Sequence, residues 1–144
     1  MGIAYNVFAF SEIQKGDFRR AKLYSYQALD ILEESSEPFI ITCRNLAEVN
    51  TNQGAYDKAL EYLLASRTVQ ETLKITNFSA FTNIQIAKVY YRKGKYKESF
   101  DICLKTLNNY QNNNPLDGWE ASTYHVMGLI YAAQKEFQLS LDNY

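Results

Sequence analysis

One short pattern occurs four times in this chain, and it restricts the possible folds more than any other feature. The copies are KGDFRRAK, QGAYDKAL, KGKYKESF and QKEFQLSL. Each has a turn position, an aromatic residue two places later and a small residue three places after that. The turn positions are spaced by 38, 40 and 41 residues and hold Gly16, Gly54, Gly94 and Lys135. A regular period of this length is typical of proteins built from stacked repeats.

The residues on both sides of each turn position have helical spacing. A large apolar residue followed by a small one precedes every turn, as in Leu46-Ala47. After the turn, small residues recur at intervals of three and four, which places them on one helical face. Each unit is therefore predicted to be a helix, a short turn and a second helix. We expect four units, 1–37, 38–76, 77–114 and 115–144, with helices at 2–14, 17–34, 38–52, 56–74, 78–92, 96–110, 117–133 and 137–144.

Composition agrees with an all-α protein and excludes several classes of function. The chain has only six Gly and two Pro in 144 residues, so breakers of helices are scarce. A net charge of −1 offers no electrostatic attraction for nucleic acid. No apolar stretch reaches the ~18 residues of a membrane span, and no signal peptide is visible, so we expect a cytoplasmic protein. The alternative, if the chain is a fragment, is an extracytoplasmic sensor region. The fourth unit stops inside its second helix, and we therefore expect this chain to be part of a longer protein.

Over essentially its whole length, the chain resembles the tetratricopeptide repeat. The resemblance rests on the large-small pair, the glycine, the aromatic residue and the small residues at these offsets. The resemblance implies a right-handed α-solenoid whose concave side is lined by the first helix of each unit. An aromatic residue expected early in that helix is present as Tyr5 and Tyr124 but replaced by Cys43 and Asn83. The units are longer than the usual ~34 residues. They resemble the longer repeats of bacterial regulatory and signalling proteins.

The sequence carries no pattern that predicts catalysis, a metal site or a cofactor. The glycines lack the context of a phosphate-binding loop, which needs a strand leading into a helix. His125 is the single histidine and has no set of ligands or nucleophile at a recognisable spacing. Cys43 and Cys103 fall in apolar-periodic segments and are predicted to be buried free thiols. Asn77 begins a glycosylation sequon but is interpreted as the cap of the third unit's first helix.

The resemblance also implies which side of the first helix of each unit faces a ligand. In this chain that side carries amides, aromatic rings and charges. The residues expected in this ligand surface are Asn6, Phe10, Arg44, Asn45, Glu48, Asn52, Phe81, Lys88, Tyr91, Arg92 and His125. Such a mixed surface suits an extended or helical peptide. The residues expected to define the repeats structurally are Gly16, Ala21, Ala28, Gly54, Ala59, Gly94 and Gly128.

Three cations of the ligand surface suggest a more specific contact. Arg44, Lys88 and Arg92 could form a positive stripe that holds a carboxylate. Alternatively, Glu48 pairs with Arg44 one helical turn away, and the face is merely solvated. The carboxylate clamp of chaperone-binding family members is not expected, because only Asn45 matches its pattern.

These observations predict a non-catalytic scaffold that binds a protein or peptide. The narrower hypothesis is the sensor or interaction region of a larger bacterial regulator. The alternative hypothesis is a structural module that self-associates, forming a homo-oligomer through the incomplete fourth unit.

Overall fold

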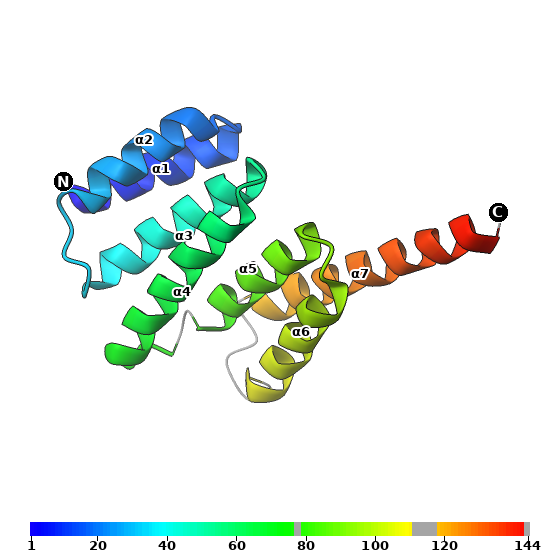
Figure 1. The fold of residues 1–144 in the computed structure, drawn as a ribbon. Helices are drawn as coiled ribbons and strands as arrows, with labels where there is room; N and C mark the ends of the chain where they lie inside the picture. The colour runs from blue at the N-terminus through cyan, green and yellow to red at the C-terminus, as the bar shows by residue number, and fades with distance from the viewer. Residues whose placement is uncertain (77–78, 111–117, 143–144) are drawn as a thin grey trace. The chain divides into compact units, whose positions relative to one another are not determined.

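A computed structural model describes residues 1–76, 79–110 and 118–142, and in this part of the chain all regular structure is α-helical (Figure 1). The described helices are α1 (Gly2–Lys15), α2 (Phe18–Leu29), α3 (Glu37–Asn52), α4 (Tyr56–Thr72), α5 (Ser79–Arg92), α6 (Tyr96–Tyr110) and α7 (Trp119–Asp142). The chain divides into two compact units, Met1–Thr82 and Asn83–Tyr144, and the division falls inside α5. The all-α class is confirmed, while the four boundaries drawn from the repeat stay a prediction.

Three glycines end the first helix of a pair, as the repeat pattern predicts. Gly16, Gly54 and Gly94 have φ of 78°, 78° and 79°, in the left-handed region that side chains disfavour. At Gly54 the glycine N–H donates to the carbonyl of Thr51, and the next N–H, of Ala55, donates to that of Asn50. The same two bonds recur at the other two glycines. This arrangement is the Schellman motif, which satisfies the last carbonyls of a helix and reverses the chain.

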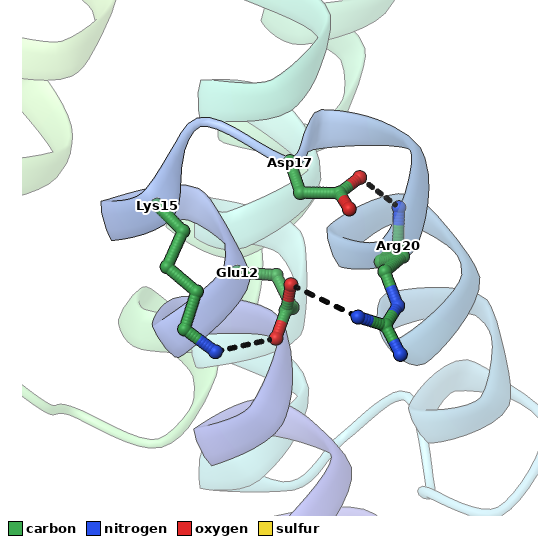
Figure 2. A network of polar contacts seen from close by, with 4 residues as sticks. All are labelled: Glu12, Lys15, Asp17 and Arg20. Atoms are coloured by element: carbon green, nitrogen blue, oxygen red, sulfur yellow. Dashed lines mark hydrogen bonds and ion pairs between the residues drawn. The ribbon is translucent and has the colours of Figure 1, made fainter.

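A polar network fastens the first of these turns (Figure 2). Asp17 caps α2 because its Oδ1 accepts the backbone N–H of Arg20 at 3.0 Å. The buried Glu12 of α1 accepts a 2.9 Å hydrogen bond from Nζ of Lys15, and its second oxygen lies 4.0 Å from Nη1 of Arg20. The end of α1 and the start of α2 are thus joined by charge as well as by packing.

Small residues let the paired helices approach closely, as the spacing predicted. Ala21, Ala28 and Ala59 are fully buried in the first unit. In the second unit, Oγ of Ser99 donates to the carbonyl of Ala87 on the facing helix at 2.6 Å. The core of that unit is a cluster on α5, α6 and α7 formed by Ile84, Ala87, Cys103, Val126 and Ile130.

The second helix of the first repeat is shorter than expected. A helix over 17–34 was predicted, but α2 ends at Leu29. The chain then turns so that Leu32 packs on Gly2, where a Cβ would lie only 2.6 Å from the Leu32 side chain. The chain therefore makes the apolar contact between Leu32 and α1 instead of continuing the helix beyond Leu29.

The fourth turn is absent, which corrects the prediction of helices at 117–133 and 137–144. α7 runs without interruption from Trp119 to Asp142. The turn position holds Lys135, and the flanking Ala133, Gln134 and Glu136 are good helix formers without a glycine to reverse the chain. Without a left-handed glycine, helix propagation is the favoured local outcome.

Two other predictions fall on residues that the structure does not describe. The proposed cap at Asn77 and the interval between the helices predicted at 96–110 and 117–133 lie outside the described residues. Pro38 lies in the first turn of α3, where the N–H that proline lacks would have no partner within the helix. Among the described helices, none is long and apolar enough to cross a membrane.

Candidate binding surface

Two of the amides expected to face a ligand instead join the first two repeats. Asn6 is buried, and its Nδ2 donates to the carbonyl of Pro38 at 2.9 Å. Its Oδ1 accepts from Oγ1 of Thr42 at 2.8 Å. Asn45 is also buried, and its Nδ2 donates to the backbone carbonyl of Asn6 at 3.2 Å. Because these groups are enclosed between α1 and α3 and already bonded, they contribute to repeat stacking rather than to an open surface.

The threonine in this network belongs to a series that the sequence reasoning missed. Thr42, Thr82 and Thr123 occupy the same position in α3, α5 and α7, and all three are buried. Thr82 accepts a 2.8 Å hydrogen bond from Nε2 of Gln70 on α4. The recurrence of threonine at one position of the repeat was the signal available in the sequence.

Arg44 is half-buried and lies against an aromatic ring. Its guanidinium carbon is 5.6 Å from the ring centroid of Phe81, within the range of a cation–π contact. Burial lowers the pKa of Arg44, and the nearby carboxylate of Glu48 opposes this change. The interaction with Glu48 fits the alternative in which that residue balances the charge of Arg44. Asn52, one turn further, is exposed and donates to the carbonyl of Glu48 at 2.9 Å.

The most exposed apolar surface of the first unit lies on α1. Ile3, Val7, Phe8 and Phe10 are between 51% and 64% exposed, although all are large apolar side chains. We call these four residues the α1 surface. In α3 the residue equivalent to Phe8 is Leu46, which is completely buried. Phe10 was expected in the ligand surface, and the register of the family directs Ile3 to the same side, but it does not direct Val7 or Phe8 toward a ligand.

The predicted residues of the second unit have three different environments. Lys88 and Arg92 lie one helical turn apart on α5, and both are exposed. Tyr91 is half-buried, packs against the core cluster and contacts Tyr96 with ring centroids 5.6 Å apart. His125 is exposed on α7. The stripe of Arg44 with Lys88 and Arg92 stays a prediction.

The described residues contain neither a cluster of metal ligands nor an exposed thiol. In residues 1–76, 79–110 and 118–142, no three His, Cys, Asp or Glu side chains gather as a metal site would require. Cys43 and Cys103 are buried and free, as predicted. Burial raises the pKa of Cys43 to about 12, with a smaller contribution from Glu34, and raises that of Cys103 to about 11. Both thiols therefore stay protonated and unreactive near neutral pH.

Comparison with known protein families gives a match in the second half of the chain. Residues 78–144 match the family described as tetratricopeptide repeat. A search of curated proteins finds no significant match to the chain.

Proposed function

We propose that the chain is a non-catalytic scaffold, because residues 78–144 match the tetratricopeptide repeat family. We also propose that the first unit of the chain binds a protein partner. Repeats of this family generally mediate protein–protein interaction. The family relationship supports the class of function, and the chemistry of the surface supports a more specific partner.

The observation that carries the proposal is the exposure of the α1 surface. Four large apolar side chains on one helix of 14 residues are more than the scattered exposure that needs no explanation. Contiguous apolar patches of this kind mark interaction sites in soluble proteins. Ile3, Val7 and Phe10 have the spacing of one helical stripe, and Phe8 lies to the side of it, with its ring against Tyr24 of α2.

The partner best suited to this surface is a helix with an apolar face. A groove or patch of aliphatic and aromatic side chains typically accepts residues at i, i+3, i+4 and i+7 of a partner helix. The α1 surface contains no charged side chain, so it offers nothing to an acidic tail. Each large side chain that becomes fully buried contributes roughly 1.5–3 kcal/mol before the costs of association.

The second unit provides a different chemistry on α5. We propose that Lys88 and Arg92 bind a carboxylate of the partner, because their exposed cations stand on the same face of the helix. In a larger bacterial regulator, occupancy of these surfaces would be the input that biases an attached output region.

Peptide display tests the proposal for the first unit. A library of helical peptides is selected on the 144-residue chain, and the affinities of the selected peptides are measured by fluorescence anisotropy. We expect peptides with an apolar stripe, and we expect the double variant Val7→Asp, Phe10→Asp to weaken their binding by at least about tenfold.

The matched control changes equally exposed apolar residues on the second helices of the first two repeats. Leu23→Asp on α2 and Leu64→Asp on α4 alter side chains that are 57% and 47% exposed. Retained affinity in this control and loss in the α1 variant would support the proposal. Equal affinity in the wild type and the α1 variant would refute it.

A further inference from the structure

The last helix of the second unit has a buried face and an opposite, exposed face. Trp119, Thr123, Val126 and Ile130 are buried. On the opposite side, Ala121, Tyr124, Gly128, Tyr131, Lys135 and Leu139 follow one another at intervals of three and four residues, and all are exposed. We call these six residues the α7 face. Its three large side chains, Tyr124, Tyr131 and Leu139, are 51% to 61% exposed.

Gly128 is the unusual member of the α7 face. The equivalent positions of the other repeats hold Ala9, Ala47 and Ala87, which the second helix of each pair buries almost completely. At Gly128 nothing lies within 4 Å of the place that a Cβ would occupy. Glycine in a helix costs about 1 kcal/mol relative to alanine, and no contact within this unit requires it. The missing side chain leaves a shallow gap on the exposed face.

We propose that the α7 face is a homodimer interface, in which the α7 helices of two copies pack antiparallel. In that orientation Leu139 of each copy fills the gap at Gly128 of the other, and two-fold symmetry makes the contact twice. The axis then passes between Ala133 and Gln134. Parallel packing would instead set Gly128 against Gly128 and leave both gaps empty.

Charge and shape agree with this antiparallel register. Lys135 of one copy comes opposite Ala132 and Tyr131 of the other, so the ammonium group can lie over the tyrosine ring. In this register Asp142 of each copy comes opposite His125 of the other. The contact therefore covers Gly128, Tyr131, Lys135 and Leu139 of each α7 face, while Ala121 and Tyr124 lie beyond its end.

The size of the face sets the expected affinity. From His125 to Asp142, the part of α7 that overlaps in this register, the helix rises roughly 26 Å at 1.5 Å per residue. A pair of helices in contact over that length buries on the order of 1,000 Å² in total, near the lower limit of specific interfaces. The dimer should therefore be weak, with Kd on the order of 1–100 µM. This interface is separate from the α1 surface and does not depend on the proposed function.

Sedimentation equilibrium on the 144-residue chain, from about 1 µM to about 500 µM, tests the inference. We expect a monomer–dimer equilibrium. Leu139→Glu should raise Kd at least about tenfold, because it places a carboxylate in an apolar gap. Gly128→Gln should also raise Kd at least about tenfold by filling the gap, while increasing the thermal stability of the monomer.

Leu141→Glu is the matched control, because Leu141 is 54% exposed on the same helix but lies on its other side. It should leave Kd within about threefold of the wild type. A wild-type chain that stays monomeric throughout, as it would if its own end folded back over Gly128, overturns the inference. So does a dimer that survives both α7-face variants, or one that Leu141→Glu disrupts equally.

Discussion

The turn at Gly54 allows a stability prediction in which backbone conformation is separated from packing. The residue has φ +78°, and no atom lies within 4 Å of the place where a Cβ would stand. A side chain there meets open space, so size alone costs nothing. Any loss of stability on substitution must come from the left-handed backbone.

The expected losses follow from how well each residue tolerates that conformation. Gly54→Ala should cost about 1 kcal/mol, and Gly54→Val about 2 kcal/mol, because a branched side chain crowds the backbone further. Gly54→Asn should cost less than alanine although asparagine is larger, since its side chain can hydrogen-bond locally in this region. For a chain of this length, 1 kcal/mol corresponds to a shift in Tm of about 4 °C.

Urea unfolding followed by far-UV circular dichroism measures these differences. The expected order of stability is Gly, Asn, Ala and then Val. If Gly54→Ala is neutral, the left-handed turn is not required for folding. If the loss instead follows side-chain volume, with Asn costing more than Ala, the strain argument is refuted.

Two further predictions concern buried polar groups. Thr42→Val removes the donor to Oδ1 of Asn6 and should lower the free energy of unfolding in urea by about 1–3 kcal/mol, because the amide oxygen is left buried without that bond. Thr42→Ser keeps the hydroxyl and should lose much less stability, and a Thr42→Val variant as stable as the wild type would contradict the role of this bond. For Cys43 and Cys103, the pKa values of about 12 and about 11 exceed the ordinary 9.0, so the folded state binds more protons than the unfolded state above pH 9. The contribution of the two thiols to the free energy of unfolding is complete below pH 9 and decreases as the pH rises toward 11. The fall in the free energy of urea unfolding over this pH range should therefore be smaller in a Cys43→Ala, Cys103→Ala variant than in the wild type.

The parts of this fold that could be predicted from sequence are those fixed by local chemistry. The glycine turns depend on a backbone conformation that only a few residues tolerate, so Gly16, Gly54 and Gly94 identified them correctly. The small residues of the second helices were equally clear, because helical periodicity alone places them on one face.

The errors came where distant residues decide the outcome. Asparagine is usually a surface residue, but Asn6 is enclosed because Thr42 and Pro38 of the next repeat supply its partners. The early end of α2 depends on the contact of Leu32 with Gly2, which no local pattern encodes. At Lys135 the aromatic and small residues of the repeat were present, but the missing glycine mattered more than the rest of the pattern.

The repeated threonines meet different partners at one position of the repeat. Thr42 donates to Asn6 of the preceding first helix, whereas Thr82 accepts from Gln70 of the preceding second helix. A hydroxyl both donates and accepts, so one residue type suits junctions whose amides come from different helices. The amide can therefore move from one helix to another between repeats while the buried polar groups keep their hydrogen bonds.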